Sequence, residues 1–138
     1  MRFMMLMIPN ISEEEYGAGP SPEDVGAMTK YNESLSQAGV LLALDGLHPS
    51  SKGARVSQSG GKIKVTDGPF AEAKELVGGY WVIQVKSKEE AVEWASRCPL
   101  DGDAMIEVRQ VYEMSDFSED VQAVGGLSET PPEQPTAS

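Results

Sequence analysis

The chain has 138 residues, and its 22 acidic and 11 basic side chains give it a net charge of −11 at pH 7. This length suffices for one domain with a hydrophobic core and is too short for two ordinary domains. Such an acidic chain lacks the broad positive surface that binds nucleic-acid phosphates, so we expect no direct contact with nucleic acid. A single cysteine and a single histidine exclude cysteine-rich zinc sites, and the cysteine usage fits a reducing compartment.

The first apolar stretch, residues 3–8, ends at Pro9. It is too short to span a bilayer, which takes about 20 apolar residues in a helix. It also lacks the small-residue cleavage site of a secretory signal peptide. We therefore predict a buried strand over residues 2–8, in a cytoplasmic protein that does not bind membranes.

Two helices are predicted in the body of the chain. Each begins at a serine that can cap its first turn, Ser21 and Ser87, and each carries an apolar stripe at helical spacing. Gly39 ends the first stripe and Pro99 ends the second. The predicted helices cover residues 22–38 and 88–98.

Strand-like stretches surround these helices. They cover residues 2–8, 40–45, 54–58, 62–66, 79–86 and 104–113. Ser59, Gly60 and Gly61 join the two middle stretches into a predicted hairpin. The order of elements predicts an α+β fold, a ferredoxin-like βαββαβ unit with an inserted β-hairpin. Because both helices would cover one face of the sheet, we expect the chain to form a homodimer through the other face.

The C-terminal residues differ from the body. Residues 115–138 carry five acidic side chains, three prolines and no lysine or arginine. We therefore divide the chain into a domain over residues 1–114 and an acidic, proline-containing tail over residues 115–138. Phe117, Val121 and Val124 share one helical face, which predicts a short helix near residues 117–124 that packs on the body or on a partner subunit.

The most distinctive string begins at Asp67. A strand ends there, Gly68 permits an unusual backbone angle, and Pro69 begins a helical turn whose free amides attract negative charge. One interpretation is structural: Asp67 caps the turn and Phe70 fills the core. The other is a substrate-binding turn built from Gly68, Pro69, Phe70 and Lys74.

His48 is the only side chain whose unperturbed pKa lies near neutrality, and it lies in a loop after the second predicted strand. A loop placed beside Asp67 would pair imidazole and carboxylate as a base and its orienting group. Alternatively, His48 is a surface residue without a role. Arg55 suits bidentate binding of an anionic substrate or a cross-strand ion pair with an acid of the sheet. For Arg109 we expect such an ion pair, with an acid such as Glu107.

Several motifs are spaced along the body. They are Asp67-Gly68-Pro69-Phe70 with the Glu-Ala-Lys-Glu that follows, Gly78-Gly79-Tyr80, residues 90–99, and Ile106-Glu107-Val108-Arg109. Together they resemble the DGPF subgroup of the YCII-related family, from the first strand to about residue 113. The resemblance implies a dimeric α/β-barrel architecture, an active site around a histidine and an aspartate, and action on small organic acids. It also implies a link to sigma-factor regulation, because genes of this subgroup often neighbour those of extracytoplasmic-function sigma factors.

We therefore predict a homodimer that binds a small anionic organic molecule. As a cofactor-free lyase or isomerase, it would use His48 and Asp67 to handle a proton and Arg55 to hold the substrate. The alternative is a non-catalytic ligand-sensing or protein-interaction module, with a regulatory protein as the partner of the acidic tail. No metal or cofactor is expected, because the sequence contains no phosphate-loop pattern and no metal-ligand cluster.

Overall fold

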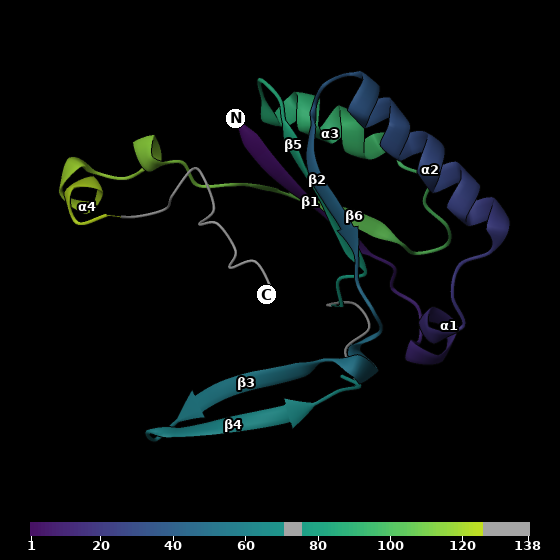
Figure 1. Cartoon of the computed structure of the whole chain (residues 1–138), viewed down its shortest axis with the longest axis horizontal. Helices are drawn as coiled ribbons and strands as arrows, with labels where there is room; N and C mark the ends of the chain where they lie inside the picture. Colours follow the sequence, from purple (N-terminus) through teal and green to yellow (C-terminus); the bar gives the residue numbers. More distant parts are fainter. Residues whose placement is uncertain (71–75, 126–138) are drawn as a thin grey trace, which may run out of the picture.

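The computed structural model describes residues 1–70 and 76–125 of the chain (Figure 1). Its central sheet has four strands in the order β2-β5-β1-β6. These strands are β1 (Arg2–Ile8), β2 (Leu41–Gly46), β5 (Gly79–Gln84) and β6 (Met105–Gln110). All three neighbouring pairs are antiparallel. The chain therefore has a mixed α+β fold, and the strand order is compatible with the predicted ferredoxin-like unit.

The two long helices begin where the sequence predicts. They are α2 (Pro22–Gln37) and α3 (Lys88–Ser96). The hydroxyl of Ser21 accepts a hydrogen bond of 3.1 Å from the Asp24 amide, and the Ser87 hydroxyl accepts one of 3.1 Å from the Glu90 amide. Each serine thus satisfies an amide that the first helical turn leaves without a backbone partner.

The core lies between these helices and one face of the sheet. Its most buried side chains are Phe3, Met5, Leu35 and Ile83. Tyr31 of α2 also faces this core, and its ring meets Trp81 of β5 edge to face, with 5.7 Å between the centroids. Its hydroxyl donates a hydrogen bond of 2.8 Å to the Trp94 carbonyl of α3, so Tyr31 ties the two helices together. Val25, which belongs to the predicted stripe of α2, is half exposed.

The other face of the sheet carries apolar side chains without a covering helix. Met4 pairs with Val82 and Leu6 with Tyr80, so these four side chains share the face opposite the core. All four are partly exposed. A homodimer that covers this face stays a prediction. Within residues 1–70 and 76–125, no helix has the length and apolar character needed to cross a membrane.

The inserted hairpin forms a separate two-stranded sheet, β3 (Ala54–Ser59) with β4 (Lys62–Asp67). Gly60 and Gly61 turn the chain with φ of 57° and 77°, a conformation that glycine adopts at little cost. A short helix, α1 (Glu13–Gly17), follows β1 and was not predicted. The helical turn predicted to begin at Pro69 falls on residues 71–75, outside the described residues.

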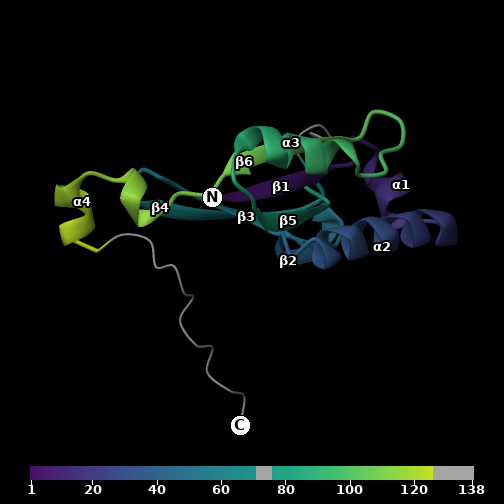
Figure 2. The ribbon, with the colours of Figure 1, turned by 90° about the horizontal axis from the view of Figure 1, so that it is seen from above.

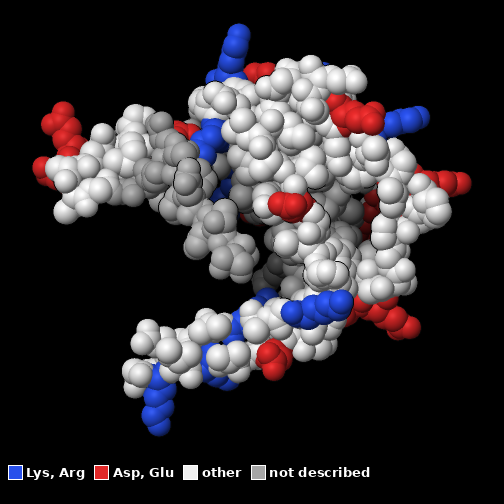
Figure 3. Space-filling model, in the orientation of Figure 1, with Lys and Arg blue, Asp and Glu red and all other residues white. Residues whose placement is uncertain are grey.

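After β6 the chain continues as a C-terminal arm, residues 112–125, which contains the 3-10 turn Met114–Asp116 and α4 (Glu119–Ala123). The hairpin and this arm extend from the body toward the same side, away from α2 and α3 (Figures 1 and 2). The space-filling view shows a hollow between them (Figure 3).

Candidate functional site

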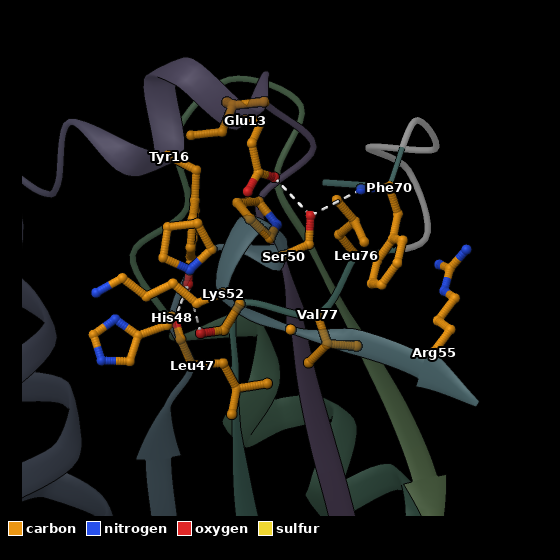
Figure 4. Close-up of a pocket in the computed structure, with 15 residues that line it drawn as sticks. Glu13, Tyr16, Leu47, His48, Ser50, Lys52, Arg55, Phe70, Leu76 and Val77 are labelled. Carbon is orange, nitrogen blue, oxygen red and sulfur yellow. Dashed lines mark hydrogen bonds between the residues drawn. The ribbon is translucent and has the colours of Figure 1, made fainter. Parts of the chain in front are cut away.

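A pocket of about 350 Å³ opens where α1, the loop after β2 and the base of the hairpin meet (Figure 4). We call it the Arg55 pocket. Its volume is in the lower part of the range for small-molecule sites. Its apolar walls include Ile11, Leu47, Leu76 and Val77. Its polar side chains come from three separate segments: Glu13, Tyr16, His48, Ser50, Lys52 and Arg55.

A hydrogen-bond relay joins two of these segments, α1 and the loop after β2, to the loop after β4. The Ser50 hydroxyl donates to Glu13 Oε2 over 2.9 Å and accepts from the Phe70 amide over 3.1 Å. Glu13 Oε1 also accepts from the Ser51 amide over 2.8 Å. Figure 4 shows this line of contacts from Glu13 through Ser50 to Phe70. The relay therefore fixes the loop after β4 relative to α1, although these segments are far apart in sequence.

Gly68 lies directly against the same turn. A Cβ atom built on Gly68 would lie 1.8 Å from the Ser50 carbonyl oxygen, far inside van der Waals contact. The backbone of Gly68 also donates a hydrogen bond of 3.0 Å to the Gly53 carbonyl. From the sequence we expected Gly68 to adopt an unusual backbone angle, but its φ is not positive. Close approach of two backbone segments is the reason that only glycine fits.

Tyr16 closes the pocket on the side of α1. Its hydroxyl lies within hydrogen-bond distance of two carbonyl oxygens, Leu47 at 2.5 Å and Gly78 at 2.9 Å, which share its single proton. Burial raises the pKa of the Tyr16 phenol above its ordinary value, and the nearby Glu13 carboxylate raises it further. The phenol therefore stays protonated at neutral pH and serves as a donor that joins the strand ends of β2 and β5.

Arg55 occupies the opposite side of the pocket. Its guanidinium carbon lies 3.9 Å from the centroid of the Phe70 ring, which is a cation–π contact. No ion pair of Arg55 is present within residues 1–70 and 76–125. The guanidinium lies over the Phe70 ring, and guanidinium N–H groups bind carboxylates in a bidentate manner.

Only some of the predicted site residues that the structure describes line the Arg55 pocket. His48, Arg55 and Phe70 line the Arg55 pocket. His48 lies on the side of Lys52, across the pocket from Arg55 (Figure 4). Asp67 is exposed at the end of β4 and is not among the described lining residues. The pairing of His48 with Asp67 therefore stays a prediction.

The remaining predicted residues contribute in different ways. Gly68 and Pro69 are not among the described lining residues, but Gly68 packs against the Ser50 turn that forms part of the wall. Lys74 lies outside the described residues. In the described part of the chain, no group of three histidine, cysteine or acidic side chains could hold a metal ion.

Sequence reasoning missed the polar residues that the fold adds to the pocket. They are Glu13, Tyr16, Ser50 and Lys52. A helix at Glu13 could have been predicted, because Ser12 followed by three glutamates is typical of a helix start. Its contact with Ser50 was not available, because it depends on where two loops pack. Arg109 pairs with Glu107, with 3.3 Å between the guanidinium and the carboxylate, but the two residues lie on the same strand, so the predicted cross-strand pairing is wrong.

Two comparisons with known proteins found matches to this chain. A family model of the YCII-related domain matches residues 1–115. One curated relative, an uncharacterized protein of Rhizobium meliloti (strain 1021), is 39% identical over 59 residues. The match covers 43% of this chain and 48% of the relative, so this chain spans about half the length of the curated relative it matches. Membership of the DGPF subgroup stays a prediction. Because the family model covers most of the chain, the chain belongs to the YCII-related family.

Proposed function

We propose that this chain binds a small organic acid in the Arg55 pocket, with the acid's carboxylate on the Arg55 guanidinium. The observation that carries the proposal is the cation–π contact of Arg55 with Phe70 beside an apolar wall. An arginine already held against an aromatic ring loses less side-chain entropy on binding an anion than a free arginine would. In a chain with twice as many acids as bases, a cation that makes no ion pair in the described part suits an anionic ligand.

The other pocket walls suit the rest of such a ligand. Leu47, Leu76 and Val77 form an apolar surface against which a short carbon skeleton packs. Lys52 adds a second positive charge across the pocket from Arg55 (Figure 4). The ligand class that follows is a small carboxylic acid with an apolar body.

His48 gives this site a proton-handling group. Its imidazole lines the same pocket as Arg55, and an imidazole can both accept and donate a proton. We assign it the removal of a proton from a carbon of the bound acid. In an isomerase His48 would return that proton to carbon, whereas in a lyase it would pass the proton to the leaving group as the carbon–carbon double bond forms. Because Asp67 is exposed and does not line the described pocket, the proposal gives this role to His48 without Asp67.

The proposal includes a homodimer formed through the sheet face that α2 and α3 leave uncovered. Met4, Leu6 and Val82 support it, because they place partly exposed apolar side chains together at the centre of that face. Contiguous apolar surface of this kind marks interaction sites in water-exposed proteins. Charged side chains of β6, Glu107 and Arg109, border the face.

Ligand-observed NMR with a panel of small aliphatic and aromatic carboxylates tests the binding. We expect at least one acid to bind the wild-type protein and to bind the Arg55→Ala variant about ten- to hundredfold more weakly, which corresponds to about 1.5–3 kcal/mol for a charged hydrogen bond. Arg109→Ala is the matched control, because that exposed arginine pairs with Glu107 on another part of the surface. Equal binding by the wild type and Arg55→Ala would contradict the proposal.

A further inference from the structure

The inserted hairpin has one polar and one apolar face. In its register Val56 pairs with Val65 and Gln58 with Ile63, whereas Arg55 pairs with Thr66 and Ser57 with Lys64. Side chains alternate along each strand, so the valines and the isoleucine share one face, and Arg55 and the lysines share the other. Val56 is 69% exposed, Val65 60% and Ile63 72%. The apolar face of the hairpin is thus open to solvent.

A two-stranded hairpin with an open apolar face is marginally stable in water unless another element covers it. Three branched apolar side chains on adjacent strands form a contiguous patch, which distinguishes them from isolated apolar residues on a surface. The hairpin carries three basic residues, Arg55, Lys62 and Lys64, and one acid, Asp67. Its net positive charge is opposite in sign to that of the whole chain.

The C-terminal arm has the complementary properties. It carries four acids and no basic residue, and in α4 the acids Glu119 and Asp120 directly precede the exposed Val121. Val124 is 88% exposed. Acidic and apolar side chains therefore occur together on the arm, as basic and apolar side chains do on the hairpin.

The arm is internally ordered although it projects from the body (Figure 1). Arg2 of β1 donates two hydrogen bonds, of 2.7 Å and 3.0 Å, to the Glu113 carboxylate at its base. The rings of Tyr112 and Phe117 stack with 4.9 Å between centroids. The side-chain amide of Gln122 donates a hydrogen bond of 2.8 Å to the Phe117 carbonyl, which holds α4 against the preceding turn. A held arm presents its apolar and acidic side chains at a lower entropic cost than a free segment would.

We propose that the C-terminal arm of one copy docks on the apolar face of the hairpin of a second copy. Val121 and Val124 would cover Val56, Ile63 and Val65. Lys62 and Lys64 belong to the opposite face of the hairpin, and Asp67 lies on the apolar face. The two lysine ammonium groups would therefore reach the carboxylates of the arm around the open edges of the two-stranded hairpin. Both elements extend toward the same side of the body and leave a hollow between them (Figure 3). Each chain therefore offers two surfaces to its partner, the C-terminal arm and the apolar face of the hairpin. We call this contact between the arm of one copy and the hairpin of the other the clasp. It rests on the homodimer proposed above, and it would be a second contact between the two copies besides the one at the sheet face.

Zero-length carbodiimide cross-linking of the full wild-type chain tests the clasp, because it joins lysine amines only to carboxylates in direct contact. Nitrogen-15-labelled and unlabelled protein are mixed, and native mass spectrometry verifies that mixed dimers have formed. We expect cross-links from Lys62 or Lys64 to Glu119 or Asp120, including pairs that join a labelled to an unlabelled peptide. Such mixed pairs require contact between two copies.

The other outcomes separate the clasp from the dimer. Mixed dimers whose cross-links at these residues always join peptides of the same label would show that the arm docks on its own hairpin, which overturns the proposal. Mixed dimers without these cross-links would overturn the clasp and leave the sheet-face dimer standing. Absence of any dimer would overturn both.

Charge reversal gives an independent measurement. In sedimentation equilibrium, we expect Lys62→Glu with Lys64→Glu to raise the dimer dissociation constant about tenfold, because like charges would meet at the clasp. Adding Glu119→Lys with Asp120→Lys to the same chain should restore dimerisation. The control pair is Lys86→Glu with Lys88→Glu, two exposed lysines of the body. An unchanged constant in the hairpin variant, or no restoration, would contradict the clasp.

Discussion

The hydroxyl of Ser50 donates a hydrogen bond of 2.9 Å to the carboxylate of Glu13, which lies 37 residues earlier in the chain. The same hydroxyl accepts from the Phe70 amide, 20 residues later. Because Phe70 carries the Arg55 guanidinium on its ring, this one serine connects α1 to the cation that we assign to ligand binding. Glu13 and Ser50 are therefore positioning residues of the Arg55 pocket.

Replacing Ser50 tests this relay. Ser50→Ala removes two hydrogen bonds at a partly buried position, so we expect the free energy of unfolding to fall by about 1–2 kcal/mol. Acid binding should weaken as well, because Phe70 loses its anchor. The control is Ser51→Ala, since Ser51 contacts Glu13 through its backbone amide. Urea unfolding measures both variants, and equal stability of the two would contradict the relay.

A methyl group at Gly68 tests the close approach of the two backbone segments. Its Cβ would overlap the Ser50 carbonyl oxygen, so the turn must move, and we expect Gly68→Ala to destabilise the fold by about 1–3 kcal/mol. Gly46→Ala is the matched control, because a Cβ atom at Gly46 would meet no atom within 4 Å. A thermal melt in which the two variants unfold at the same temperature would refute this account of Gly68.

Local patterns predicted the regular elements well. Capping serines and stop signals fixed α2 and α3 to within two residues at each end, and the glycine pair fixed the hairpin turn. The helix α1 was missed because it spans five residues and buries none of them, so it has no apolar periodicity. Tyr31 was missed as a core residue because its hydroxyl finds a carbonyl partner on α3, which a hydropathy pattern does not show.

From the sequence, we could predict only those pocket residues whose side-chain type alone suggests function. His48 and Arg55 were found because imidazole and guanidinium groups near loops suggest function. Glu13 and Ser50 were missed because their role comes from a contact between distant loops. Asp67 was chosen for its position beside a glycine and a proline. The fold leaves it exposed at the end of β4.

Solvent deuterium exchange tests the role of His48. In D2O, we expect the protein to exchange a carbon-bound hydrogen of its bound acid, and His48→Gln to slow this exchange by about 10²–10⁴-fold. The affinity for the acid should change little, because Arg55 and not His48 holds the carboxylate. If the wild-type protein binds the acid and exchanges no hydrogen, the non-catalytic ligand-sensing alternative replaces the lyase or isomerase proposal.

Cys98 is predicted to be unreactive in the folded protein. It is buried on α3's side of the core, and burial raises the pKa of its thiol to about 11. A raised pKa leaves little thiolate at pH 7–8, and the thiolate is the reactive form. We expect an aromatic disulfide reagent to label Cys98 only after denaturation, or slowly through transient unfolding. Rapid labelling of the native protein at pH 7 would contradict this burial.

The central claim is that Arg55, held on Phe70, recognises a carboxylate. Titration of the wild-type protein with the tightest acid from the panel, and with the primary amide of the same acid, tests it most directly. The account predicts that the acid binds at least about tenfold more tightly, because a charged hydrogen bond contributes about 1.5–3 kcal/mol. It also predicts that the Arg55 Nε–Hε resonance shifts with the acid alone. Equal affinities for acid and amide, with the Arg55 resonance unmoved, would contradict it.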